Sequence, residues 1–192
     1  MKLDEDQSLI KDILKGDKRS FEKLMKKYNR RIYNFIYRMI RDEESSIELS
    51  QEFFIKIYTV MYKYNFQYKF STWAYRICYN LVIDHIRKNQ VKIDSLDGKD
   101  IKQKQILDHT GTQLKDGYHN LEKEEIKTIV WDVVDTIPVK YRELILLRYM
   151  QGLKYDEIAE FTDLPVGTVK NRIFKAKEIL KMEMLKNEMF KE

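Results

Sequence analysis

The stretch YDEIAEFTDLPVGTVKNRIFKAK, residues 155–177, decides how the C-terminal part of this chain folds. A short amphipathic run ends at Phe161, three residues form a turn, and a longer amphipathic run begins at Pro165. A short helix, a three-residue turn and a longer helix, in this order, are typical of a helix-turn-helix. Pro165 fits the first position of a helix, where its missing N–H loses no partner. We therefore predict a helix-turn-helix here.

The second helix of this motif has two chemically different sides. The apolar side recurs at helical spacing: Val169, Ile173, Ala176 and Leu180. The residues that we predict to contact DNA are Thr168, Lys170, Asn171, Arg172, Phe174 and Lys175. Asparagine and lysine can read base edges in the major groove, and a phenylalanine can pack on a thymine methyl group. Arg172 lies between the two sides, where it either contacts phosphate or braces the fold. The alternative is a solvated basic helix with an incidental aromatic residue.

Composition favours an all-α fold. The 192 residues include only six glycines and two prolines, and 43% are hydrophobic while 35% are charged. A single cysteine, Cys78, excludes an internal disulfide and fits a reducing compartment. The N-terminus is acidic, and no run approaches the roughly 20 apolar residues of a membrane span, so we expect a cytoplasmic protein.

No sequence pattern indicates catalysis or a bound cofactor. The three histidines, His85, His109 and His119, have no metal-like spacing with Cys78, and the chain has no glycine-rich phosphate loop. We therefore expect a protein that is not an enzyme and that needs neither a metal nor a cofactor.

Periodicity divides the chain into two small helical domains, residues 1–90 and 121–192, joined by a flexible linker, residues 91–120. The linker is polar, holds three of the six glycines and balances five lysines against five aspartates. The net charge is +6 in residues 1–90, −4 in residues 121–163 and +4 in residues 164–181. The predicted recognition helix is thus a basic island in an acidic domain, which favours an anionic partner.

The N-terminal domain contains a second candidate nucleic-acid surface. Residues 62–70 alternate aromatic with polar side chains and predict a loop, after which Ser71 or Thr72 would cap a helix. The candidate contacts are Tyr64, Asn65, Phe66 and Lys69 in the loop and Arg76, Asn80, Asp84 and Arg87 along one side of the helix. Such aromatic and amide groups can stack on and hydrogen-bond to unpaired bases. In the alternative interpretation the aromatic residues are core and Asp84 only pairs with Arg87 or Lys88.

Three more amphipathic segments complete a small helical bundle. Residues 7–41 supply two helices with a break at Gly16-Asp17, and residues 47–62 supply a third. In the third helix Glu48, Gln51 and Glu52 face outward, while Leu49 belongs to the apolar side.

Three stretches together resemble the extracytoplasmic-function (ECF) sigma factors, the specificity subunits of bacterial RNA polymerase. IELSQEFFIKIY, residues 47–58, is similar to the family's D-L-x-Q-E-x-F helix. FSTWAYRICYNLVIDHIRK, residues 70–88, is similar to its F-x-x-W-L-x-x-I-A-x-N-x-x-x-D-x-x-R helix. LKYDEIAEFTDLPVGTVKNRIFKAKEIL, residues 153–180, is similar to its Y-x-E-I-A…G-T-V-K-S-R segment. The order and spacing of the three stretches strengthen the resemblance, which covers nearly the whole chain outside the linker.

The resemblance implies a function and partners. The first domain would bind core RNA polymerase through Glu48, Leu49, Gln51 and Glu52, and would open promoter DNA near −10 with the loop and the Asn80 helix. The second domain would read the −35 duplex, and an anti-sigma factor, often membrane-anchored in relatives, would hold the protein inactive. Glu48, Asp163 and Asn171 depart from the aspartate, glycine and serine that are frequent at these positions. The alternative is a stand-alone helix-turn-helix regulator whose first domain senses a signal.

Overall fold

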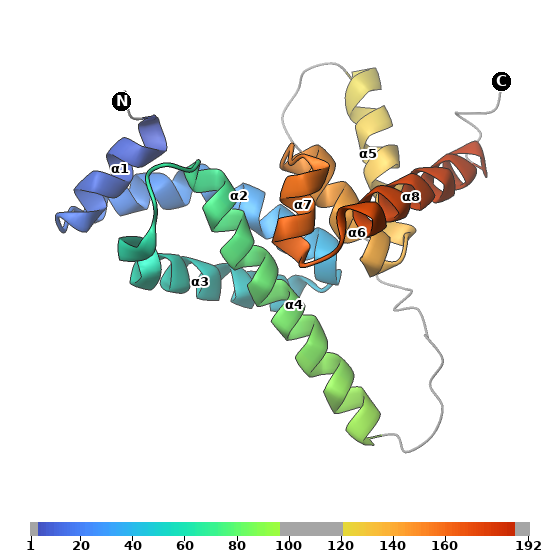
Figure 1. The fold of residues 1–192 in the computed structure, drawn as a ribbon, viewed down its shortest axis with the longest axis horizontal. Coiled ribbons are helices and arrows are strands. Elements are labelled where there is room, and N and C mark those ends of the chain that lie inside the picture. The colour runs from blue at the N-terminus through green and yellow to red at the C-terminus, as the bar shows by residue number, and fades with distance from the viewer. Residues whose placement is uncertain (1–3, 97–120, 187–192) are drawn as a thin grey trace. The chain divides into compact units, whose positions relative to one another are not determined.

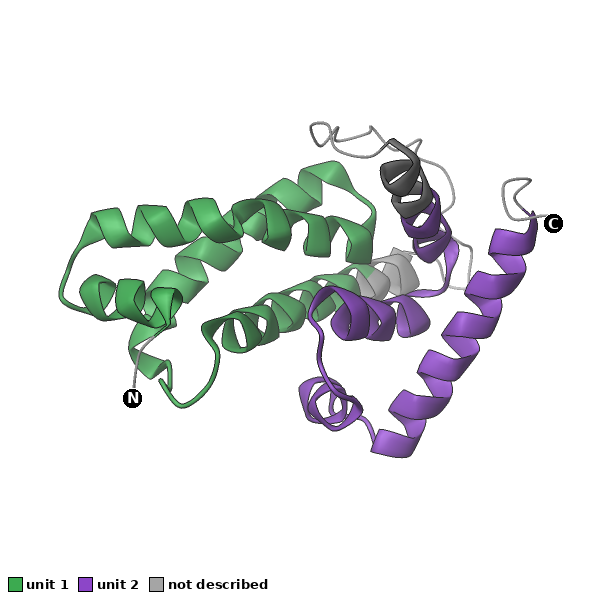
Figure 2. Ribbon diagram, turned by 90° about the horizontal axis from the view of Figure 1, so that it is seen from above, with its two compact units in different colours: residues 1–107 green, residues 108–192 purple. Residues whose placement is uncertain are grey.

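The computed structural model describes residues 4–96 and 121–186, and every regular element within these two ranges is helical (Figure 1). The prediction of an all-α fold is therefore confirmed for the described residues. The chain divides into two compact units between residues 107 and 108 (Figure 2). Of the predicted linker, residues 91–96 continue the last helix of the first unit, and residues 97–120 lie outside the described ranges.

The first unit is a helical bundle arranged around its second helix. Its elements are α1 (Glu5–Leu14), α2 (Lys18–Ile40), α3 (Glu43–Val60), the short 3₁₀ turn η1 (Met61–Lys63) and α4 (Phe70–Leu96). Helix α2 packs against α1, α3 and α4, and α3 also packs against α4. The fully buried residues of this core include Ile10, Ile32, Phe35, Ile36, Phe53, Ile57, Ala74, Cys78 and Val82.

The predicted break at Gly16-Asp17 is confirmed. Gly16 has a positive φ of 96°, a conformation that glycine adopts without steric cost. Asp17 then caps α2, because its carboxylate accepts a hydrogen bond from Arg19 N at 3.0 Å and another from Ser20 Oγ at 2.8 Å. The bond from Ser20 is the main reason why the pKa of Asp17 lies below its usual value.

The second unit holds α5 (Leu121–Thr136), α6 (Val139–Ile145), the π-helical turn η2 (Leu146–Met150), α7 (Tyr155–Thr162) and α8 (Val166–Lys186). Helix α8 packs against α5, α6 and α7. The side chains at the centre of the unit are apolar and buried: Leu144, Leu146, Leu147, Ile158, Val169 and Ile173. The core thus contains Val169, Ile173 and Ala176 of the apolar side predicted for the second helix of the helix-turn-helix.

Several helix starts differ from the sequence-based expectation; α1 begins at Glu5, two residues early, and α3 begins at Glu43, four residues early. Asp135 and Thr136 are residue types that cap helices, and the sequence predicts one of them as the cap of the next helix; α5 instead continues through Thr136, and Pro138 occupies the cap position of α6. Helix α4 begins at Phe70, one residue before the predicted cap, because the Phe70 ring is buried in the bundle core. Helix α8 begins at Val166, so Pro165 precedes the first helical residue rather than occupying it.

Candidate nucleic-acid interface

The turn between α7 and α8 sets the geometry of the helix-turn-helix. Asp163 adopts the left-handed conformation, with φ 56° and ψ 38°, and its N–H bonds to Ala159 O to end α7. Leu164 N also donates to Ala159 O, at 3.1 Å. The carbonyl of Pro165 then accepts from Thr168 N at 2.8 Å and from Val169 N at 3.1 Å, which starts α8. The turn therefore connects α7 to α8 within three residues.

Helix α8 presents two sides with opposite exposure. Val169, Ile173 and Ala176 are at most 1% exposed and form the contact with α6 and α7. The predicted DNA contacts on the other side are exposed: Lys170, Asn171, Phe174 and Lys175. Phe174 has 64% of its surface accessible, so its ring is available for a contact. Thr168 is only half-buried, and Leu180, expected on the buried side, is half-buried as well.

Arg172 lies at the boundary of the two sides, and its surroundings bear on its two predicted roles. Its Nη1 atom is 3.8 Å from Glu143 Oε1 of α6, and Glu143 is itself buried. The guanidinium thus has a carboxylate partner on a neighbouring helix of its own unit. The structure therefore favours the bracing role for Arg172 over a free phosphate contact.

Lys177 extends the basic side of α8 by one turn and was not predicted from the sequence. Its ammonium lies 5.7 Å from the ring centroid of Tyr149, and a hydrogen bond to the Tyr149 hydroxyl raises the pKa of Lys177. The lysine thus lies beside Tyr149, which is itself exposed. Tyr149 comes from η2, so only the folded unit places it next to α8.

The loop of the first unit, residues 64–69, has an inner and an outer side. Asn65, Gln67, Tyr68 and Lys69 are exposed, and Phe66 is half-buried. Tyr64 differs, because it is only 6% exposed and its ring lies 5.0–5.7 Å from the rings of Phe66, Phe70 and Trp73. The structure thus places Tyr64 under the loop, as the core interpretation of these aromatic residues expects, and leaves Tyr68, which was not among the predicted contacts, 65% exposed.

The polar residues of α4 that follow the loop share one exposed side. Arg76, Asn80, Asp84 and Arg87 are all exposed, while Ala74, Cys78 and Val82 of the same helix are completely buried. Eleven residues at 1.5 Å per residue give this stripe a length of about 16 Å. Among the described side chains, no ion pair joins Asp84 to Arg87 or Lys88. Loop and stripe therefore form consecutive parts of one polar surface.

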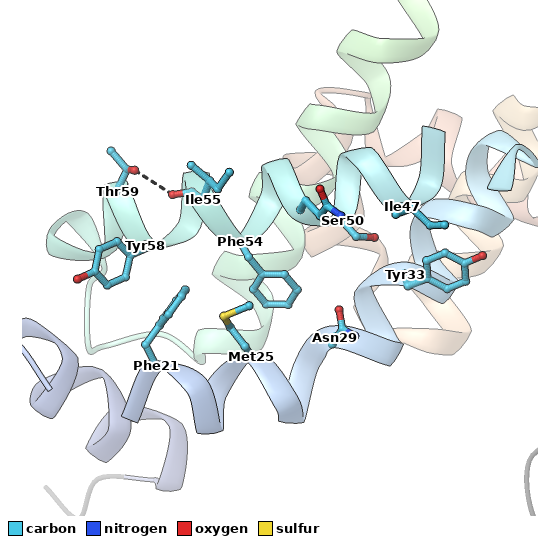
Figure 3. A pocket seen from close by; sticks show the side chains of 11 residues that line it. Phe21, Met25, Asn29, Tyr33, Ile47, Ser50, Phe54, Ile55, Tyr58 and Thr59 are labelled. Carbon is cyan, nitrogen blue, oxygen red and sulfur yellow. Dashed lines mark hydrogen bonds between the residues drawn. The ribbon is translucent and has the colours of Figure 1, made fainter. Parts of the chain in front are cut away.

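Helix α3 offers a different kind of surface. Glu48, Gln51 and Glu52 are exposed as predicted, but Leu49 is 5% exposed and packs into the bundle. Beside Gln51, an apolar groove of about 600 Å³ runs between α2 and α3 (Figure 3). Phe21, Met25 and Tyr33 line it from α2, and Phe54, Ile55 and Tyr58 line it from α3. Exposed apolar side chains flanked by acidic and amide groups are typical of a protein-binding surface.

The described residues offer no group of three or more His, Cys, Asp or Glu side chains that could hold a metal ion. In the same part of the chain, none of the helices has the length and apolar character needed to cross a membrane. His109 and His119 lie outside the described residues.

A helix-turn-helix unit that follows a separate helical bundle is the architecture of a sigma-70-type factor, and comparison with known proteins agrees. Residues 24–91 match the protein family described as "Sigma-70 region 2", and residues 127–180 match the family described as "Sigma-70, region 4". The ECF RNA polymerase sigma factor SigW of Bacillus subtilis is 33% identical over 181 residues, which cover 91% of this chain and 94% of SigW. The RNA polymerase sigma-H factor of Pseudomonas aeruginosa is 31% identical over 179 residues, or 92% of each chain. This chain belongs to the ECF RNA polymerase sigma factor family, whose members are transcription initiation factors.

Solved structures share the fold. The sigma factor RpoE of Bartonella quintana, crystallised with the anti-sigma factor NepR, is 19% identical, with a TM-score of 0.65 over 88% of this chain and 99% of that chain. CnrH, solved with the cytosolic domain of CnrY, is 18% identical, with a TM-score of 0.62 over 94% of this chain and 97% of that chain. At these identities the likeness concerns the fold alone.

Proposed function

We propose that this protein binds core RNA polymerase in the cytoplasm, directs it to promoters with −35 and −10 elements, and helps to open the DNA. Membership of the ECF family supports the general activity. The protein would act by binding alone, without a catalytic step of its own, because promoter opening can be driven by the binding energy of the separated strands.

The observation that carries the proposal is the exposed side of α8. Lys170, Asn171 and Lys175 surround Phe174 on a helix whose opposite side is buried in the unit. The second helix of a helix-turn-helix lies in the major groove, where amide and ammonium groups reach base edges and an apolar ring can contact a thymine methyl group. We assign −35 recognition to this surface. Lys177 would contact the phosphate backbone at its far end.

Promoter opening falls to the first unit. Asn65, Gln67 and Tyr68 stand at the exposed tip of the loop, and α4 continues this surface through the stripe that begins at Arg76. Aromatic faces stack on any unpaired base, and amides add hydrogen bonds that discriminate between bases. We assign the −10 non-template strand to this surface. Tyr64 supports the loop from below and does not contact DNA.

Helix α3 and the groove beside it are our candidate for docking on core polymerase. The exposed Glu48, Gln51 and Glu52 supply the polar rim, and Ile55 and Tyr58 supply apolar area. Leu49 would act only by shaping the helix from inside. The two structural relatives named above were solved with an anti-sigma factor or a cytosolic partner domain, so we propose that this protein too has an anti-sigma factor, which would cover the same surface.

Transcript 5′-end sequencing after overproduction of the protein tests the proposal. We expect new start sites that share two upstream elements, and we expect purified protein and core polymerase to initiate at those sites on double-stranded templates. A stand-alone regulator would bind the duplex without core polymerase and would not replace the resident sigma subunit. The absence of initiation from every new site with the reconstituted enzyme would refute the proposal.

A further inference from the structure

A buried amide from α1 reaches the inner side of the loop at residues 64–69. Gln7 is only 6% exposed, and its Nε2 atom lies 2.8 Å from Phe66 O and 3.5 Å from Tyr68 O. The same atom is 3.4 Å from the Tyr64 hydroxyl, which in turn donates to Tyr68 O at 2.5 Å. Gln7 Oε1 accepts from Asp4 N at 3.3 Å, so both ends of the amide have partners.

The loop depends on these contacts because it has few of its own. Tyr68 N donates to Asn65 O at 3.2 Å, and Gln67 N donates to Asn65 Oδ1 at 2.9 Å. The carbonyls of Phe66 and Tyr68 point inward to Gln7 and Tyr64. A buried carbonyl that loses its donor costs more than an average hydrogen bond contributes, so the loop conformation is coupled to Gln7.

Helix α1 is itself anchored to the bundle, which makes Gln7 a fixed support. Asp6 accepts a hydrogen bond from the hydroxyl of the buried Tyr28 at 2.6 Å and pairs with Lys27 at 2.7 Å, and Lys11 lies 5.9 Å from the centroid of the Phe66 ring. Burial and the bond to Asp6 raise the pKa of Tyr28, so that its hydroxyl stays protonated at neutral pH. Helix α1 lies outside residues 24–91, the range that the region 2 description matches.

We propose that Gln7 is a positioning residue for base capture: it holds the loop of residues 64–69 in the shape that presents Asn65, Gln67 and Tyr68 to an unpaired −10 base. The inference rests on the proposed function of this loop. The position of Gln7 requires a particular chemistry, since the side chain there must direct a hydrogen-bond donor at two carbonyl oxygens, those of Phe66 and Tyr68. A side chain of the same size without that donor, or with only acceptors, will not replace it.

The first test measures loop order without DNA. Amide hydrogen exchange is compared in the full-length wild type, Gln7→Met and Gln7→Glu. Methionine keeps the length and loses the donor, while glutamate turns oxygen atoms toward the two carbonyls. We expect the Gln67 and Tyr68 amides to exchange about tenfold or more faster in both variants, because a lost buried hydrogen bond shifts local opening by that order.

Two variants separate loop order from general stability. Ser8→Ala changes an exposed neighbour on α1 and should alter nothing. Ile10→Val removes one methyl group from the fully buried contact between α1 and the bundle, and should lower the melting temperature without selectively exposing the loop. Loop exchange in Gln7→Met that only matches the change in Ile10→Val would overturn the inference.

The second test measures base selection by the holoenzyme. Single-stranded oligonucleotides carry each of the four bases at the position that the wild type discriminates most strongly. We expect Gln7→Met to reduce the ratio of best to worst affinity by about tenfold while −35 duplex affinity and core binding stay constant. A smaller fraction of folded protein would lower all four affinities equally, so it cannot produce the expected fall in the ratio. A ratio that stays unchanged in Gln7→Met overturns the inference. If the wild type shows no base preference, the proposed function of the loop is refuted, and so is the role of Gln7 in base capture. The hydrogen-exchange test still decides whether Gln7 holds the loop in shape.

Discussion

Two neighbouring residues on α8, Ile173 and Phe174, differ in role: one packs in the core and the other lies on the surface, as their exposed fractions show. Ile173 is 1% exposed and Phe174 is 64% exposed, although both are large and apolar. Helical periodicity predicted this division correctly, because a step of 100° per residue puts adjacent side chains on different sides of a helix. The burial of Tyr64 and the support from Gln7 could not be predicted in the same way. Tyr64 lies among the rings of Phe66, Phe70 and Trp73, and Gln7 reaches it from 57 residues earlier in the chain.

A matched pair of substitutions tests the two tasks. Ile173→Ala should lower the free energy of unfolding of the second unit by about 2–5 kcal/mol, since it opens a cavity in the core. Phe174→Ala should change that free energy by no more than about 0.5 kcal/mol, as exposed positions usually do, and should weaken −35 binding. Chemical denaturation and duplex binding measure the two effects. An equal loss of stability in both variants would contradict the assignment of Phe174 to the DNA surface.

The lone cysteine gives a second test at this scale. Cys78 is fully buried in α4, and burial raises the pKa of its thiol, so the reactive thiolate is scarcer at any given pH than in an exposed cysteine. We expect labelling by a thiol reagent at pH 8 to be about a hundredfold or more slower in native protein than in urea-unfolded protein. Rapid labelling of the native protein would show that α4 is not packed on α2 and α3 as described.

At the scale of elements, one turn and one helix show what the sequence can predict. The turn between α7 and α8 was predicted from the spacing of its two helices, and the structure adds the left-handed conformation of Asp163, which aspartate tolerates better than most residues. The start of α4 lies one residue before the predicted cap, at Phe70, whose ring is buried in the bundle core. Such a tertiary contact is not visible in the sequence pattern. The position of α1 against the loop was not predicted, because an amphipathic pattern shows that a helix has a buried side but not what covers it.

Two substitutions at Asp163 test the turn. Asp163→Gly should be neutral or slightly stabilising, because glycine adopts a positive φ without steric cost. Asp163→Val should destabilise the second unit by about 1–2 kcal/mol, since a β-branched side chain is strained in the left-handed region. Thermal unfolding of the two variants measures the difference. Equal melting temperatures would mean that the turn does not hold this conformation in solution.

At the scale of the whole molecule, the chain combines two units with different chemistry. The first unit carries an exposed aromatic and amide surface, which we propose binds unpaired bases, and the second carries an exposed basic helix, which we propose binds a duplex. Composition and periodicity predicted that there are two helical units. Their assignment to promoter elements came from the family resemblance, because neither surface reveals the DNA sequence that it reads.

The most direct test of this division of labour is permanganate reactivity of −10 thymines in holoenzyme complexes on a double-stranded promoter. The comparison uses wild type, Asn171→Ala and Asn80→Ala. Asn171→Ala should lose about 1–3 kcal/mol of affinity at one −35 base pair and should recover full thymine reactivity at saturating concentration. Asn80→Ala should bind the duplex as tightly as the wild type, yet its thymines should become reactive more slowly at any concentration. Two variants that lose binding and opening in equal proportion would contradict separate roles for the two units.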